Sequence, residues 1–149
     1  MAKGDDKDPL DVEGAISELN RALAGQYRSV LQPTVVAGSI TGFGFQGVTD
    51  QLKVFARAEI EDVRHLVEKI VTLGGRPTAL VGALRVHDTV EESVEWLIET
   101  ETETIEALQD TTPHTGHTGD SEALEHRLEH MIMRRQEQVD FLVRAKGPD

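Results

Sequence analysis

The sequence predicts an all-α protein folded as a single four-helix bundle. Apolar residues recur at alternating spacings of three and four in four separate segments, and no stretch shows a convincing two-residue alternation. The first and last links between these segments are short and rich in glycine, whereas the link between the second and third is long. The length of 149 residues fits one domain, 1–149, with a polar tail over residues 1–8.

The first helix is expected to begin after Asp8, which acts as the N-cap, with Pro9 in the first helical position. Its apolar periodicity continues to about Ser39. The glycine-rich residues 42–44 then make a turn, so the second helix should run back antiparallel to the first.

The second helix is expected to start with Thr49 as its cap and to stop at Gly74 and Gly75, because glycine supplies a left-handed closing residue and Pro77 prevents continuation. Residues 76–87 are long enough to travel the height of a bundle. This segment is therefore predicted to be a crossover between the second and third helices.

The remaining two helices are expected from residue 88 or 89 to about 110 and from residue 120 or 121 to about 146. Residues 111–119 between them are rich in threonine and glycine and predict a turn. Two antiparallel hairpins joined by a long crossover are the expected topology.

Composition excludes several classes of function. Fifteen basic and 27 acidic residues give a formal net charge of -12, and aromatic residues make up only 4% of the chain, so no nucleic-acid partner is expected. Cysteine is absent, which removes disulfides and thiolate sites and suits a reducing cytoplasm. The polar N-terminus does not resemble a secretion signal, and we expect a cytoplasmic protein.

Residues 29–49 carry no charge, but they contain proline, glutamine and four glycines. Burial against protein is therefore expected in place of a membrane span. This stretch should be an interface or a pocket wall, since it would otherwise leave several large apolar side chains in water. A homo-oligomer is the expected assembly.

In each predicted helix the apolar residues at spacings of three and four form a stripe, or seam, along one face. Polar residues interrupt all four seams near the middle of each helix. A buried charge is costly unless it is paired or bound to metal, so these positions predict one polar layer across the bundle. They are Gln26, Glu59, Asp62, Glu101, Arg135 and Gln138.

These positions and their flanking motifs resemble the bacterioferritin and ferritin-like di-iron carboxylate superfamily. The matching pieces are Leu19-Asn20 with Gln26, Glu59-Ile-Glu-Asp62 leading into residues 68–77, and residues 139–142. The resemblance covers nearly the whole chain. It implies a ferritin-like bundle, iron oxidation at a di-iron centre and storage of ferric mineral in a hollow shell.

The resemblance also implies that the di-iron centre is degenerate. Glu59 and Glu101 match the family's ligands. At the other four positions the family has Glu for Gln26, His for Asp62, and Glu and His for Arg135 and Gln138. Haem is not expected, because Ile60 stands where haem-binding bacterioferritins have an axial methionine.

Two interpretations of this layer follow. The metal-ligand candidates are Glu59, Asp62 and Glu101, with Gln26 and Gln138, and oxygen donors suit iron or another hard divalent ion. Alternatively Arg135 replaces the metal ions by pairing with Glu59 and Glu101, which is the interpretation that charge favours.

The function predicted is that of an oligomeric ferritin-like protein that binds or stores iron or another metal, with weak or no ferroxidase activity. A metal-free structural or interaction protein is one alternative. The other is an enzyme acting on a small organic molecule in the bundle core, with Asp62, Glu101 and Tyr27 transferring protons. The sequence does not decide whether the chain is an enzyme.

The histidines outside this layer give weaker signals. His126 and His130, with Glu129 between them, match an inverted zinc-peptidase pattern, but the apolar seam turns both outward and predicts a solvated face. His65 is expected on the flank of a seam. A final set, His114 and His117, falls in the predicted turn.

Overall fold

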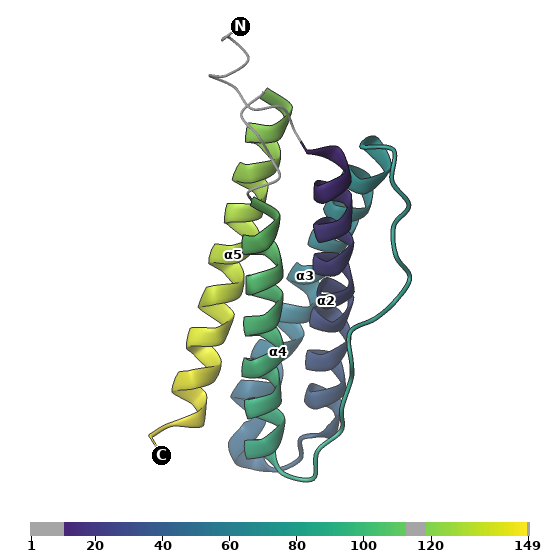
Figure 1. The fold of residues 1–149 in the computed structure, drawn as a ribbon. Coiled ribbons are helices and arrows are strands. Elements are labelled where there is room, and N and C mark those ends of the chain that lie inside the picture. Colours follow the sequence, from purple (N-terminus) through teal and green to yellow (C-terminus); the bar gives the residue numbers. More distant parts are fainter. Residues whose placement is uncertain (1–10, 113–118, 149) are drawn as a thin grey trace, which may run out of the picture.

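The computed structural model describes residues 11–112 and 119–148, and within these ranges it contains helices and no strand. Four long helices run side by side (Figure 1). They are α2 (Val12–Ser39), α3 (Gln46–Thr72), α4 (Val90–Thr111) and α5 (Gly119–Lys146). The predicted all-α four-helix bundle is confirmed.

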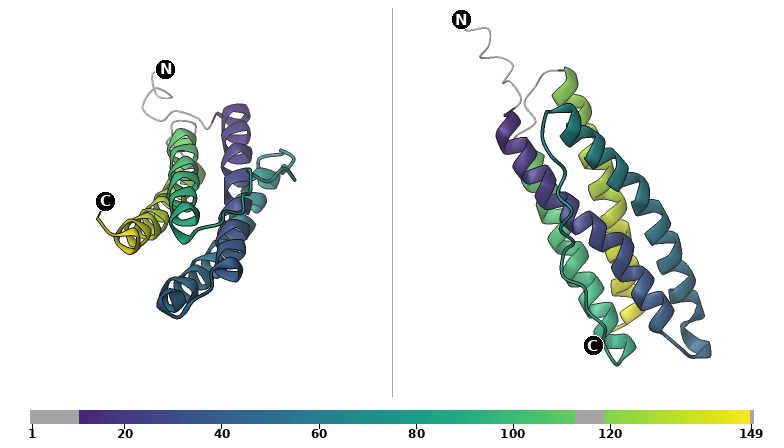
Figure 2. Two further views of the ribbon diagram at one scale, coloured as in Figure 1. Left: turned by 90° about the horizontal axis from the view of Figure 1, so that it is seen from below. Right: turned by 90° about the vertical axis from the view of Figure 1, so that its right-hand side faces the viewer.

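The connections have the predicted order. A short turn that contains the 3-10 helix η1 (Phe43–Phe45) joins α2 to α3, and the long crossover 73–89 runs along the outside of the bundle from one end to the other (Figures 1 and 2). The helices α2 and α3 therefore form one antiparallel hairpin, and α4 and α5 form another.

Two helix starts differ from the prediction. The N-cap of α2 is Asp11, whose carboxylate accepts a hydrogen bond from the backbone N–H of Gly14 at 3.1 Å; Asp8 and Pro9 lie outside the described residues. Helix α3 begins at Gln46, ahead of Thr49, because η1 leads directly into it without a side-chain cap. Thr49 is instead buried within the helix.

The other boundaries agree with the sequence. Helix α3 closes at Gly74, whose φ of 87° lies in the left-handed region that glycine tolerates best. Helix α4 begins after Thr89, whose hydroxyl accepts from the backbone N–H of Glu92 at 3.1 Å.

Side chains of α2 fasten the crossover to the bundle. The Asn20 side chain donates to the carbonyl of Arg76 at 3.0 Å and accepts from the N–H of Thr78 at 2.7 Å. Near the other end, Gln32 exchanges two hydrogen bonds with the backbone of Arg85, at 2.8 and 2.9 Å. These bonds satisfy backbone groups in a segment that forms no helix or strand of its own.

Between residues 79 and 86 the apolar side chains of the crossover are exposed, including Leu80 at 75% and Val86 at 76%. Leu73, at the start of the crossover, instead packs against the core. Polar contacts thus hold the crossover in place, while its exposed apolar side chains remain available to a partner.

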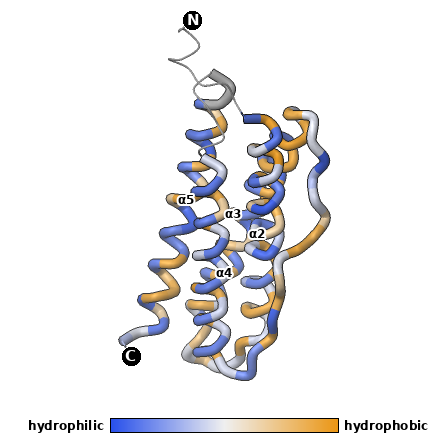
Figure 3. The backbone as a smooth tube through the Cα atoms, viewed as in Figure 1, coloured by the Kyte–Doolittle hydropathy of each residue, from blue (hydrophilic) through white to orange (hydrophobic). Residues whose placement is uncertain are grey.

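The hydrophobic core consists of two clusters, one toward each end of the bundle. Polar and apolar residues alternate along every helix (Figure 3). One cluster includes Leu19, Leu23 and Leu128, and the other includes Val36, Leu52 and Leu142. The six predicted polar positions are distributed over the four helices. In each helix they lie between the residues that belong to one cluster and those that belong to the other. None of the helices in the described ranges has the length and hydrophobicity of a membrane span.

Candidate functional site

All six predicted polar positions are buried. Each of the four helices supplies at least one of them, so they form a polar layer across the bundle. Their relative exposures are 0% for Gln26, Glu59 and Arg135, 2% for Glu101 and Gln138, and 3% for Asp62.

The guanidinium of Arg135 lies at the centre of this layer. Its Nη1 donates to Glu101 Oε1 at 2.8 Å and to the Ser29 hydroxyl at 2.6 Å. Its Nη2 donates to Glu59 Oε2 at 2.5 Å and to the side-chain carbonyl of Gln26. One fixed cation therefore joins residues from the other three helices.

The Glu59 carboxylate collects three donors. In addition to Arg135, it accepts from Gln26 Nε2 at 2.5 Å and from Gln138 Nε2 at 2.6 Å. Gln26 Nε2 also lies 3.1 Å from the backbone carbonyl of Glu59. The two amides thus use their donors to satisfy a buried carboxylate, as expected where polar groups leave water.

Ser29 completes the layer on the side of Glu101. Its hydroxyl oxygen lies 2.7 Å from Glu101 Oε2 and 3.0 Å from the carbonyl of Gly25, besides accepting from Arg135. Ser29 was not predicted, because it lies beside the apolar stripe of α2 and does not interrupt it. A serine one turn after Gln26 was the available signal.

Asp62 occupies a separate corner of the layer. Its Oδ2 accepts from Nη1 of Arg134 at 2.5 Å, and the Arg134 side chain is 39% exposed. Sequence reasoning missed Arg134 as well, since it lies off the apolar seam and looks like an ordinary surface arginine.

Burial governs the ionisation of the acids. It raises the pKa of Asp62 to about 6, aided by the nearby Glu59 and opposed by Arg134 and Arg135. Burial also raises the pKa of Glu101, although Arg135 and Ser29 favour its charged form. For Arg135, burial alone would lower the pKa, but the carboxylates of Glu101, Glu59 and Asp62 outweigh burial and raise it.

The raised pKa of Asp62 predicts that acid stabilises the fold at this position. Between about pH 4 and pH 6 the folded state holds a proton that the unfolded state has lost, so stability should fall by about 1.4 kcal/mol for each pH unit of rise. Thermal melts of the parent and Asp62→Asn over this range should show the loss of that contribution in the variant. Identical slopes in both proteins would contradict the assignment.

The side chains present do not fit a di-metal centre. Two carboxylates of the layer, Glu59 and Glu101, contact the guanidinium of Arg135, so a fixed positive charge occupies the space between them. Within residues 11–112 and 119–148, no three His, Cys, Asp or Glu side chains are grouped so that they could hold a metal ion. A guanidinium among the ligands would also repel divalent ions.

The predicted proton-transfer role of Tyr27 is not supported by its contacts. Its hydroxyl donates to the carbonyl of Thr78 in the crossover at 2.9 Å. Tyr27 therefore helps to fasten the crossover.

Three of the other histidines discussed above lie where the sequence predicts, and two lie outside the described residues. His126 and His130 are exposed, as predicted, and His65 is partly buried on the flank of α3. His114 and His117 lie outside the described residues. Helix α4 also has an exposed acidic face, which comprises Glu91, Glu92, Glu95, Glu99, Glu103 and Glu106.

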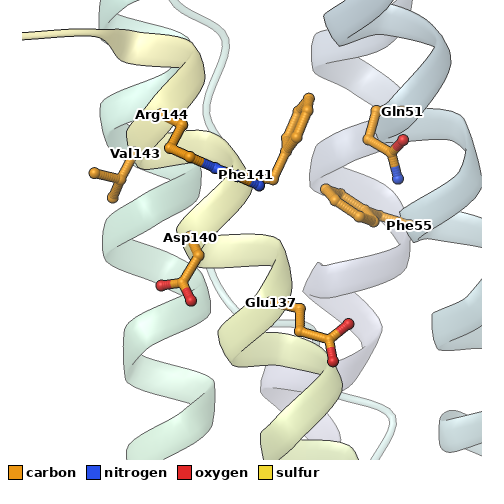
Figure 4. A pocket seen from close by; sticks show the side chains of 7 residues that line it. All are labelled: Gln51, Phe55, Glu137, Asp140, Phe141, Val143 and Arg144. Atoms are coloured by element: carbon orange, nitrogen blue, oxygen red, sulfur yellow. The ribbon is translucent and has the colours of Figure 1, made fainter.

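Two of the surface hollows are lined by none of the six residues of the polar layer. One, of about 720 Å³, lies between α3 and α5, where Phe55 and Phe141 meet edge to face with ring centroids 5.6 Å apart (Figure 4). The other, of about 340 Å³, is almost wholly apolar and lies between α2, α3 and the crossover. Its lining is Tyr27, Val30, Leu31, Ile60, Val63, Ala79 and Val81.

Comparison with known proteins agrees with this architecture. The model of the ferritin-like domain family matches residues 16–145. A ferritin-like, diiron-carboxylate protein structure from Bacillus anthracis str. Ames is similar with a TM-score of 0.86 and 27% identity, covering 92% of this chain and 98% of the other. No curated protein matches the chain.

Two bacterioferritin structures share the fold. The Desulfovibrio desulfuricans protein, described with its diiron site in different catalytic states, has a TM-score of 0.80 and 20% identity over 92% of this chain and 80% of its own. The Rhodobacter capsulatus protein, described with a metal-free dinuclear site and haem iron, has a TM-score of 0.74 and 18% identity over 86% and 80% of the two chains.

Proposed function

The chain belongs to the ferritin-like domain family, and we propose that it is the subunit of a homo-oligomer with weak or no ferroxidase activity. The observation that carries this proposal is the position of Arg135. Its guanidinium is fully buried and bonded to both family-type carboxylates, Glu59 and Glu101. The bundle therefore has an internal cation that can balance these acids without iron.

Charge and ligand count support weak oxidation chemistry. Three acids, Glu59, Asp62 and Glu101, face two guanidiniums, those of Arg134 and Arg135. Two divalent ions would need more negative charge and more ligands than remain. Oxidation by a pair of irons requires both to be held.

A single-metal site is a second candidate, favoured by the surroundings of Asp62. This buried acid lies near Glu59, and its arginine partner reaches it from a half-exposed position. If Arg134 turned into solvent and Arg135 gave up its contacts with Glu59 and Glu101, Asp62 could share a hard divalent ion with these two acids. Gln26 and Gln138 would then supply neutral oxygen donors. This proposal keeps the five predicted ligands together.

Iron binding or storage by the assembly is the broader part of the proposal. It is supported by family membership, by the net charge of -12 and by the acidic face of α4, because such a surface concentrates cations. We place the chain in the cytoplasm, as its lack of cysteine suggests.

Fe(II) oxidation tests the central proposal. The parent protein should oxidise added Fe(II) under air no faster than the buffer blank, because the second iron would lack the ligands replaced by Arg135 and Gln138. Stopped-flow absorbance of the ferric product measures this rate. A fast phase that saturates at two irons per chain would contradict the proposal.

The apolar hollow supports a homo-oligomer. Leu31 and Ile60 are 41% and 53% exposed beside it, and Val81 from the crossover is 43% exposed. Within the predicted interface stretch 29–49, Val36 belongs to the core but Phe43 is fully exposed. Apolar area of this kind is costly in water and is reduced when copies associate.

Substitution on this face should break the oligomer. The parent should have a mass well above 16.4 kDa in light scattering after size exclusion, and Ile60→Asp should lower it, because a carboxylate would be buried without a partner. Val143→Asp is the matched control, since Val143 is 49% exposed on α5 and does not line the apolar hollow between α2, α3 and the crossover. A monomeric parent at micromolar concentration would exclude this assembly.

A further inference from the structure

Helix α5 presents two imidazoles to solvent on successive turns. His126 and His130 are both exposed, and their Nε2 atoms lie 3.2 Å apart. The two rings are nearly perpendicular, with centroids 4.6 Å apart. The two Nε2 atoms thus lie within hydrogen-bond distance of each other on the outside of the helix, and the tautomers decide which ring donates.

This separation suits two ligands of one metal ion. Imidazole nitrogens bind zinc at about 2.0–2.1 Å, so two of them on one ion at tetrahedral or square angles lie roughly 2.8 to 3.4 Å apart. Histidines four residues apart on a helix provide this arrangement without a change in the backbone.

Glu129 adds a feature that favours the binding form of His126. Its Oε1 lies 3.9 Å from Nδ1 of that ring. A carboxylate on this side favours a proton on Nδ1 and leaves Nε2 free as a metal ligand, as carboxylates do beside many metal-bound histidines.

The helix that carries the pair is held by the core. Leu128 and Met131, which flank the pair on the opposite face of α5, are 0% and 2% exposed. The Cα positions of both histidines are therefore fixed, and binding needs only the adjustment of two short side chains.

We propose that His126 and His130 form a surface site for one late first-row divalent ion of the type of Zn(II), Cu(II) or Ni(II). Neutral imidazole suits these ions, whereas the acids of the bundle centre suit harder ones. Water completes the coordination. The site is separate from the Arg135 centre, so it does not depend on the function proposed above.

Binding without peptidase chemistry is the expected activity. The sequence pattern of His126, Glu129 and His130 resembles that of zinc peptidases, but such catalysis needs a third protein ligand beside the open position. The described part of the chain places no third His, Cys, Asp or Glu with the pair in a group that could hold a metal.

Zinc titration of the full chain, free of any affinity tag, tests the site. Competition with a zinc-sensitive dye should show one Zn(II) per chain in the parent. Removal of either ligand by His126→Ala or His130→Ala should weaken binding by about tenfold or more, since even the loss of a supporting group often costs that much. The double variant should be little weaker than either single variant, because a lone imidazole no longer chelates.

Two control variants make the result specific. His65→Ala on α3 should bind Zn(II) like the parent, and so should a variant carrying His114→Ala and His117→Ala. The Cu(II)-loaded parent should show nitrogen coordination by electron paramagnetic resonance, and His130→Ala should lose part of it. Parent binding no tighter than that of the double variant, or binding lost only with His114 and His117, would overturn the proposal.

Discussion

Replacing Arg135 with alanine should lower the free energy of unfolding by about 3 to 5 kcal/mol in the presence of a chelator. The substitution leaves the buried carboxylates Glu59 and Glu101 without their shared cation. It also removes the N–H groups that donate to the Gln26 side-chain carbonyl and to the Ser29 hydroxyl. Neither of these residues contacts another side-chain cation in the layer. Denaturant unfolding of the parent and the variant measures the difference.

A matched control separates this effect from the loss of any arginine. Arg64 also contacts two acids, Glu61 and Glu68, at 2.7 and 2.8 Å, but its side chain is 53% exposed. Arg64→Ala should change stability far less, because solvent screens exposed pairs and hydrates the acids left behind. Equal losses in both variants would show that the burial of Arg135 has no special effect.

Metal should recover part of the lost stability. With the guanidinium removed, Glu59, Asp62 and Glu101 supply oxygen ligands for a hard ion. Mn(II) or Fe(II) should therefore raise the melting temperature of Arg135→Ala more than that of the parent, by mass action on the folded state. An equal gain in the parent would show that Arg135 does not block the centre and would favour a working metal site.

The polar layer could be predicted because its residues violate the apolar pattern of the helices that carry them. Arg135 interrupts a seam of Leu128, Met131 and Leu142, and all four of these side chains are buried. The partners were harder to predict, because a seam fixes the direction of a side chain but not its height relative to a neighbouring helix. Pairing with both Glu59 and Glu101 depends on that register.

Off-seam residues escaped the sequence analysis for a physical reason. Ser29 lies beside the seam and joins the layer because its short hydroxyl reaches both Glu101 and Arg135. Arg134 reaches the buried Asp62 with a long side chain whose base lies near the surface. Helical periodicity does not describe such reach, since it records only where a side chain starts.

Helix starts were less predictable than helix ends. Glycine marks the end of α3 through a backbone conformation that few residues adopt, and Gly74 has that conformation. An N-cap can be any of several nearby acids or hydroxyls, and α2 is capped by Asp11, which follows the predicted Asp8 in the chain. Thr49 was a plausible cap, but the 3-10 turn at residues 43–45 starts α3 earlier.

Restoring the family's ligands should create ferroxidase activity in this chain. The variant combines Gln26→Glu and Asp62→His with Arg135→Glu and Gln138→His. With Glu59 and Glu101 it would hold four carboxylates and two imidazoles in a layer whose positions are already buried together. Four negative charges balance two divalent ions, and the fixed cation that opposes them is gone.

The critical control for this restored variant keeps Arg135 and carries only the other three substitutions. Its guanidinium would still contact Glu59 and Glu101, so Fe(II) oxidation should stay at the level of the buffer blank. The fourfold variant should instead show a fast phase that saturates near two irons per chain, with a folded state that depends on metal because four buried acids repel one another without it. If the triple variant oxidises Fe(II) as fast as the fourfold variant, the loss of activity in this chain must be assigned to Gln26, Asp62 or Gln138, and Arg135 is then only a structural partner of the two acids.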